Sequence, residues 1–322
     1  MNFLRHSLAL CAFIGAVGFA ALALAADDED APKDLVLKGD AKCTACHDDA
    51  DSPALLAIGK TRHGTVADGR TPSCTQCHGE TEKHMKKKGN VSPDIIFRTR
   101  KGTFEPLEAR AQNAVCLSCH EKDAKRSHWY GSVHESQDVT CASCHKLHQA
   151  QDKMRDKRVQ PEVCYTCHKE QRAQANKPSH HPIAEGKMGC SDCHNVHGSA
   201  GPKLLVRDSV NQTCYTCHME KRGPFVRSHE PVDDDCSNCH NPHGTTAESM
   251  LKMRAPFLCS TCHTPHGSVQ PALAGQGAAS NIVTWGSGAA ITQGRSCMNC
   301  HTQVHGSNNP SATNPTPQRF FR

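Results

Sequence analysis

Apolar residues are concentrated in one segment of this chain, at its N-terminal end. Residues 1–6 include the basic Arg5, an apolar run then extends to Leu24, and four acidic residues follow from Asp27. A basic start, an apolar centre and a small-residue Ala-X-Ala site are typical of a secretory signal peptide. We therefore assign residues 1–25 to a signal peptide that is cleaved after Ala25. The alternative is an uncleaved membrane anchor, because the run is close to the minimum spanning length.

The rest of the chain shows no sustained alternation of apolar and polar residues, and glycine and proline are scattered through it. This pattern predicts short α-helices and loops, with almost no β-sheet. Glycine follows a histidine in Asn195–Gly198 and in Asn241–Gly244, which suits a left-handed cap on helices of about two turns. Residues 26–305 would form the folded domain, with a longer Gly-, Ala- and Ser-rich loop at 268–294. Residues 306–322 are predicted to be a flexible C-terminal tail.

Cysteine and histidine carry the chemical information in this chain. Ten copies of Cys-X-X-Cys-His use twenty of the 21 cysteines, and the remaining one, Cys11, lies in the leader. The motif attaches a c-type haem: two thiols add to the two vinyl groups, and the adjacent histidine becomes the first axial ligand of the iron. One copy could also be a zinc site or a redox dithiol, but neither needs a histidine after every second cysteine.

The sequence therefore predicts ten covalent haem c groups as cofactors. Their cofactor-binding residues are Cys43, Cys46, Cys74, Cys77, Cys116, Cys119, Cys141, Cys144, Cys164, Cys167, Cys190, Cys193, Cys214, Cys217, Cys236, Cys239, Cys259, Cys262, Cys297 and Cys300. The histidines of the ten motifs, as predicted iron ligands, are His47, His78, His120, His145, His168, His194, His218, His240, His263 and His301.

Composition agrees with a multihaem c-type cytochrome. Hydrophobic residues make up 37% of the chain and aromatic residues only 4%, too few for an ordinary side-chain core at this length. Ten apolar macrocycles could replace that core, with short helices and loops wrapped around them. The formal net charge of +5 needs no nucleic-acid partner, because each haem also brings two propionates that Lys and Arg can meet.

The motifs recur as pairs. Within the central part of the chain, alternate motifs advance by 45 to 50 residues, so the repeating unit contains two haems and is used five times. The first to fifth pairs begin at Cys43 and Cys74, Cys116 and Cys141, Cys164 and Cys190, Cys214 and Cys236, and Cys259 and Cys297.

Twelve further histidines lie outside the leader and the motifs, and ten irons need ten second ligands. In each central pair, one histidine stands shortly before the second motif and another stands three residues after that motif's own histidine. This spacing, with two further histidines from each outer pair, assigns the predicted distal ligands His63, His84, His134, His148, His181, His197, His229, His243, His266 and His305. His128 and His180 are left over, and the spacing leaves the choice between His180 and His181 open. A single such histidine could equally be a surface or propionate-binding side chain.

The short spacing within a pair has a geometric consequence. His194 and His197 would stand on one side of a helical turn, so they could not bind one iron from opposite faces. The downstream histidine must then serve a different haem, which would lock neighbouring cofactors together.

Three segments, Cys214–Pro224, Cys239–Gly244 and Gly294–Ser307, closely resemble the exported decahaem cytochromes of the MtrA, MtoA, PioA and DmsE group, and the resemblance covers nearly all of the mature sequence. It implies haems that all have two histidine ligands, in an elongated periplasmic cytochrome associated with the outer membrane. It also favours His134 and His181 over His128 and His180. Some relatives have a long segment before the first haem. This chain has only residues 26–42, so no function of that segment is transferred.

The resemblance further implies a haem wire that plugs into an outer-membrane β-barrel and passes electrons between the periplasm and the cell exterior. Other expected partners are periplasmic or inner-membrane cytochromes, and an extracellular multihaem cytochrome or a terminal reductase. Outward flow would serve metal or dimethyl sulfoxide reduction, and inward flow would serve iron oxidation; the sequence is compatible with both directions. The alternative is a soluble periplasmic electron shuttle without a barrel partner.

Catalysis is not expected, and no catalytic residue is assigned. Two histidines per iron leave no open coordination position, which catalysis at a haem requires. A nitrite or hydroxylamine-type reductase would show a motif with lysine in place of histidine, or a haem without a second ligand, and neither pattern is visible.

Overall fold

The computed structural model describes residues 40–64, 70–87, 91–97, 105, 107–263, 297–299 and 301–308. The predicted signal peptide, the predicted loop at 268–294, His266 and Cys300 lie outside the described residues. Across the described ranges the chain forms helices and loops and contains no β-strand, which confirms the predicted fold class. None of the helices in these ranges is long and apolar enough to span a lipid bilayer.

Most helices are only one or two turns long. The α-helices are α1 (Ala41–Thr44), α2 (Pro53–Leu56), α3 (Cys74–His78), α4 (Glu82–Lys87), α5 (Ala109–His120), α6 (Val133–Ser136), α7 (Cys141–Cys144), α8 (Gln160–Cys164), α9 (Lys169–Ala175), α10 (Val210–Cys214) and α11 (Glu230–Asp234). The 3-10 helices are η1 (Ala57–Lys60), η2 (Arg62–Gly64), η3 (Ala124–Arg126), η4 (Lys153–Arg155), η5 (Cys190–Asp192), η6 (Pro202–Leu204), η7 (Met219–Lys221), η8 (Cys236–Asn238), η9 (Glu248–Met250), η10 (Cys259–Thr261) and η11 (Cys297–Asn299). Helices this short are not stable alone, so tertiary contacts must hold them.

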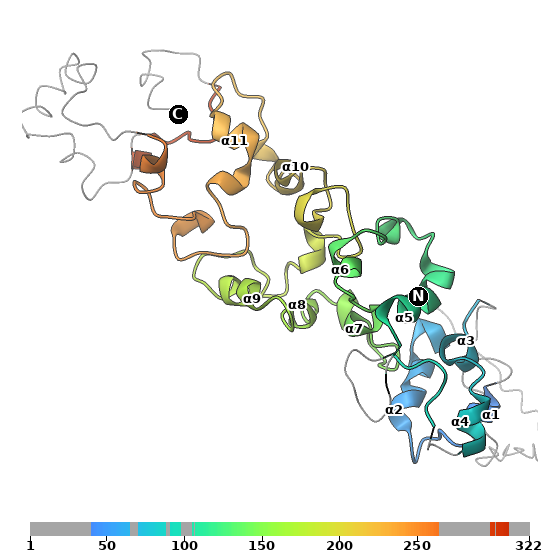
Figure 1. Ribbon diagram of the computed structural model, residues 1–322. Coiled ribbons are helices and arrows are strands. Elements are labelled where there is room, and N and C mark those ends of the chain that lie inside the picture. Colours follow the sequence, from blue (N-terminus) through green and yellow to red (C-terminus); the bar gives the residue numbers. More distant parts are fainter. Residues whose placement is uncertain are drawn as a thin grey trace, which may run out of the picture.

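The elements follow one another along an elongated path, with α1 to α5 gathered at one end and α10 and α11 towards the other (Figure 1). Isolated backbone bridges tie distant loops together along this path, as between Ser179 and Thr245 and between Arg227 and Ser307. The second bridge involves residues predicted to belong to the tail. The Asn308 side chain also accepts a 3.0 Å hydrogen bond from the Val226 amide, so residues 306–308 are held by the folded part.

The prediction of two-turn helices before Asn195 and Asn241 is wrong. The motifs there form the single 3-10 turns η5 and η8, and the glycines after the histidines lie in loops. Gly198 has a φ of +111°, and a Cβ atom at this position would lie 1.9 Å from the carbonyl oxygen of His128. The glycine is therefore required by a close approach between two segments of backbone, and no helix cap is involved.

Apolar burial within the described ranges is small. The buried hydrophobic residues are Leu117, Trp129, Tyr165, Ala175, Leu205 and Ala247. Polar side chains are buried in larger number, among them Asp40, Asn113, Gln160 and Asn211. The polypeptide alone does not build an ordinary side-chain core, as its composition predicts.

Candidate cofactor-binding histidines and cysteines

Nine histidine ring pairs are distributed along the described residues. In every pair one ring belongs to a Cys-X-X-Cys-His motif, the other is a predicted distal histidine, and the ring centroids are 6.0 to 6.2 Å apart. The pairs are His47 with His84, His78 with His148, His120 with His63, His145 with His197, His168 with His134, His194 with His243, His218 with His181, His240 with His305, and His263 with His229.

This separation suits one metal ion between two imidazoles. Rings that bind a metal from opposite sides, through nitrogens about 2.0 Å from it, have centroids about 6 Å apart. Two rings that stack directly can have centroids closer than this. Direct stacking would also give no reason for one ring of every pair to follow a Cys-X-X-Cys motif. The donor set fits a haem iron held by two histidines.

Hydrogen bonds from Nδ1 fix the orientation of most of these rings. Eight of them have a backbone carbonyl oxygen as partner, and a carbonyl only accepts, so Nδ1 must carry the proton and Nε2 keeps its lone pair. The acceptors are Ile95 for His78, Val91 for His84, Val196 for His134, Leu55 for His148, Pro242 for His181, Lys203 for His194, Val304 for His229 and Ser249 for His240, at 2.6 to 2.9 Å.

Carboxylates take the same role at two motif histidines. The Nδ1 atom of His120 lies 2.9 Å from Asp123 Oδ2, and that of His145 lies 2.7 Å from Asp152 Oδ2. A carboxylate on Nδ1 fixes the ring and increases the basicity of the opposite nitrogen. These second partners are the kind that orient a metal-binding imidazole.

Burial keeps several of the rings neutral. It lowers the pKa of His78 and of His194, and burial together with the nearby His145 ring lowers the pKa of His197 to about 4. Burial also lowers the pKa of His243. Neutral imidazole is the form that binds a metal, so these sites favour the competent state at physiological pH.

The pairing links neighbouring motif pairs reciprocally. We call the contact region between two successive motif pairs a junction. At each of four junctions, a distal histidine of the earlier pair faces the first motif histidine of the later pair. A distal histidine of the later pair faces the second motif histidine of the earlier pair. The junction contacts are His63 with His120 and His78 with His148, His134 with His168 and His145 with His197, His181 with His218 and His194 with His243, and His229 with His263 and His240 with His305.

The two histidines that the sequence left unassigned are not part of these ring pairs. His180 is engaged at both nitrogens, through Nδ1 to the Lys177 carbonyl oxygen and through Nε2 to Glu185 Oε1 at 3.2 Å. Its neighbour His181 faces His218. His128 lies along a surface hollow with Tyr130 and Ser132. The geometry therefore separates His181 from His180.

The motif cysteines approach one another in two alternating ways. Within each pair, the two leading cysteines lie close enough for the second thiol to shift the pKa of the first: Cys43 and Cys74, Cys116 and Cys141, Cys164 and Cys190, Cys214 and Cys236, and Cys259 and Cys297. Between pairs, the trailing cysteine of one motif comes near the trailing cysteine of the next, as for Cys77 and Cys119 and for Cys144 and Cys167. Consecutive attachment sites are thus in close succession along the molecule.

The motif pattern did not predict one set of buried polar residues. Asn113 and Asn211 accept hydrogen bonds from the amides of Cys141 and Cys236 at 2.8 and 2.7 Å, and so tie the two motifs of a pair together. Both stand three residues before the leading cysteine of the first motif, as does Asp40. This fixed offset is a signal that could have identified them.

Comparison with known proteins agrees with this arrangement. Residues 74–159 match the family described as "Cytochrome c-type protein NrfB-like", and residues 180–223 and 229–267 match the "Doubled CXXCH motif" family. The chain is also 31% identical over 144 residues to "Cytochrome c-type protein NrfB" of Escherichia coli, a match that covers 42% of this chain and 69% of the relative.

A longer match extends over most of the chain. It is 45% identical over 279 residues to "Multiheme cytochrome MtrA" of Shewanella baltica, and this covers 85% of the present chain and 80% of the relative. Identity at this level over this length, together with the attachment motifs, shows the family. The chain belongs to the MtrA family of multihaem c-type cytochromes, and it is an electron-transfer protein with covalently bound haem rather than an enzyme.

Proposed function

We propose that this protein is a decahaem electron conduit in which every haem iron has two histidine ligands. The nine ring pairs carry the proposal, because each joins one motif histidine to one distal histidine at the separation that a shared iron requires. By elimination, the tenth pair is His301 with His266, the latter outside the described residues. When bound, haem supplies a one-electron carrier whose potential depends on its axial ligands and surroundings.

The chain's own residues hold these carriers in a fixed order. Reciprocal exchange of histidines means that no pair can move away without giving up ligands on both sides of a junction. The Nδ1 hydrogen bonds restrain the rings, and in three cases the acceptor is the carbonyl just before another distal histidine: Val196 before His197, Pro242 before His243 and Val304 before His305. At these three junctions the scaffold therefore couples the two distal histidines to one another.

The first test is the number of cofactors. Ten complete motifs predict ten haems on each mature polypeptide, measured by intact mass spectrometry together with a haem-iron assay. Nine or fewer in fully matured protein would contradict this number. The same sample should show only low-spin ferric haem, because two histidines occupy both axial positions. An appreciable high-spin signal would contradict the ligand assignment and favour an enzyme.

We further propose that the conduit works in the periplasm with an outer-membrane β-barrel as its sheath. The N-terminal leader supports export, and the resemblance to exported decahaem cytochromes supports the barrel. The charged loops between motifs would be costly in lipid, so a polar lumen is needed around them. Small barrels of about eight strands are filled by their own side chains, so the partner should have well over 16 strands.

A liposome experiment tests this second step. Reduced methyl viologen is trapped inside and an oxidant is placed outside. The cytochrome with its barrel should discharge the dye, whereas the cytochrome alone should not. Equal discharge without the barrel, or none with it, would contradict the conduit and favour the soluble shuttle. Direction depends on the potentials of donor and acceptor, and iron oxidation and metal or dimethyl sulfoxide reduction both use the same carrier chain.

A further inference from the structure

In three of the motif pairs a neutral amide side chain bridges the two attachment motifs. Asn113 accepts from the Cys141 amide through Oδ1 and donates through Nδ2 to the Val139 carbonyl oxygen at 3.0 Å. Asn211 makes the corresponding contacts in the fourth pair. Gln160 does so in the third pair, accepting from the Ser191 amide at 3.0 Å. Each of these side chains uses its oxygen and its amide nitrogen and carries no charge.

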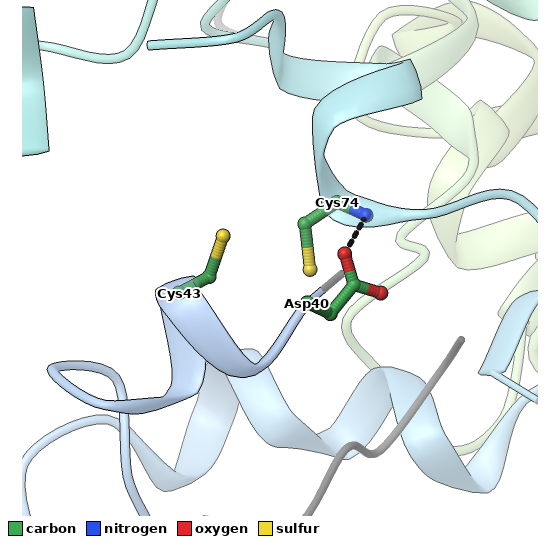
Figure 2. A group of neighbouring side chains, drawn as sticks. All are labelled: Asp40, Cys43 and Cys74. Carbon is green, nitrogen blue, oxygen red and sulfur yellow. Dashed lines mark hydrogen bonds between the residues drawn. The ribbon is translucent and has the colours of Figure 1, made fainter. Parts of the chain in front are cut away.

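The first pair has Asp40 at this place. Its Oδ1 accepts a 2.8 Å hydrogen bond from the Cys74 amide, as Figure 2 shows, so it ties the two motifs together in the same way. The side chain is fully buried, and Oδ2 has no hydrogen-bond partner among the described residues. A carboxylate thus occupies, beside the leading cysteines Cys43 and Cys74, the place that amides occupy in the second to fourth pairs.

Lys42, two residues after Asp40, does not pair with this carboxyl group. Lys42 on α1 points its ammonium to Glu80 Oε2 at 3.3 Å, and that pair is exposed to solvent. Asp40 instead acts on the attachment thiols: burial and then Asp40 raise the pKa of Cys74 to about 12, and both also raise the pKa of Cys43. In the third pair, which has no carboxylate at this place, the two leading thiols act mainly on each other, and this raises the pKa of Cys164 while it lowers that of Cys190.

A metal site is the other chemistry that this cluster could support. The donor atoms of Asp40, Cys43 and Cys74 all lie within 4.8 Å of one another. A metal such as Zn²⁺ would require thiolates, and both sulfurs are consumed as thioethers when haem is attached. In the mature protein the Asp40 carboxyl group is then left buried next to the first two attachment sites.

We propose that Asp40 sets the reduction potential of the first haem pair and holds it below that of the pairs bridged by amides. This inference rests on the proposed function, since it takes the first two motifs to carry haem. Reduction of ferric to ferrous iron adds one electron, and a negative charge nearby opposes it. The opposition is strong for a buried charge, which water and salt screen poorly. The first pair would then be the weakest electron acceptor among these four pairs. The reduction potential would therefore change between the first pair and the other three.

The test is a reciprocal exchange of side chains. Asp40→Asn removes the charge and keeps the shape, and Asn113→Asp introduces a charge at the matching place in the second pair. Potentials are followed by spectroelectrochemical titration of the haem absorbance. In Asp40→Asn we expect two of the ten transitions to become about tenfold easier to reduce, a shift of about +59 mV. In Asn113→Asp we expect two different transitions to shift in the opposite direction.

Haem content and spin state, measured on the same samples, separate this inference from the proposed function. Fewer than ten haems in the unmodified protein would contradict the proposed function. A ten-haem, low-spin Asp40→Asn variant with unmoved potentials would overturn the role of Asp40 and leave the conduit intact. If Asp40→Asn fails to mature, Asn113→Asp decides: a lower potential for one pair supports the charge effect, and unmoved potentials overturn it.

Discussion

In the central pairs each motif histidine faces a histidine from a neighbouring pair, whereas at the start of the chain His47 faces His84 of its own pair. The distal histidines also lie in different kinds of local structure. His197 and His243 lie in loops that end in a glycine with positive φ, while His84 lies in α4 with its Nδ1 bonded to the Val91 carbonyl oxygen. The same attachment motif is therefore completed in two ways.

This difference indicates that the junction between pairs is the true structural repeat. A junction needs a pair on each side, whereas the first motif takes its facing histidine, His84, from its own pair. The bridging residue follows the same division, since Asp40 is a carboxylic acid while Asn113, Gln160 and Asn211 are amides. The end of the molecule is thus specialised both in its ligand source and in its electrostatics.

Removal of a central haem should have the largest effect on the molecule. The double substitution Cys190→Ser and Cys193→Ser would remove the cofactor that joins His194 to His243, which leaves one of the two histidine pairs of that junction, His181 with His218. We expect the chain to become cleavable near its middle in limited proteolysis, because one cooperative unit is split into two. The control, Cys43→Ser with Cys46→Ser, should expose only the N-terminal end. Identical fragment patterns for the two variants would contradict the junction model.

Loss of one junction ligand should have a smaller and local effect. His181→Ala should leave the iron at His218 with one protein ligand, so about one tenth of the haem should become high-spin in the electron paramagnetic resonance spectrum. His180→Ala is the matched control, because its ring bonds to Lys177 and Glu185 instead. A high-spin signal in the control, with none in His181→Ala, would reverse the assignment.

Substitution of Gly198, which lies against the His128 backbone, should reduce stability more than substitution of Gly131, which has open space around it. In Gly198→Ala the new Cβ would meet the His128 carbonyl oxygen, and the positive φ would add strain, for a loss of roughly 3 kcal/mol in the free energy of unfolding. Gly131→Ala also has a positive φ, but its Cβ would have no neighbour within 4 Å, so about 1 kcal/mol is expected. Denaturant unfolding measures both, and equal losses would show that the close approach is unimportant.

The smallest effect concerns the exposed cation near the first pair. Lys42→Met removes a positive charge that is 42% exposed, and should make the first pair slightly harder to reduce, by less than about threefold. The effect should vanish at high salt, where surface charges are screened, while that of Asp40→Asn should persist. Titration at two ionic strengths compares them. Equal salt dependence would show that Asp40 is not shielded from solvent.

The sequence by itself determined the chemistry that depends on local covalent spacing. Two cysteines and a histidine at fixed positions are enough to identify a haem attachment site, as at Cys190, Cys193 and His194, and low aromatic content excluded an ordinary core. The short gap between His194 and His197 also required separate partners, and the structure places His243 and His145 opposite them. Helix length was misjudged, since a single 3-10 turn is sufficient when distant contacts hold the motif.

Only the tertiary structure decided which distant residues meet. His181 differs from His180 because its Nδ1 reaches the Pro242 carbonyl oxygen, 61 residues away, and no local pattern records that contact. The burial of Asp40 likewise follows from its contact with the Cys74 amide, 34 residues further along. Local spacing fixes which bonds a residue can form, whereas the partner and the burial depend on how separate segments pack, and that packing determines where a charge remains unscreened.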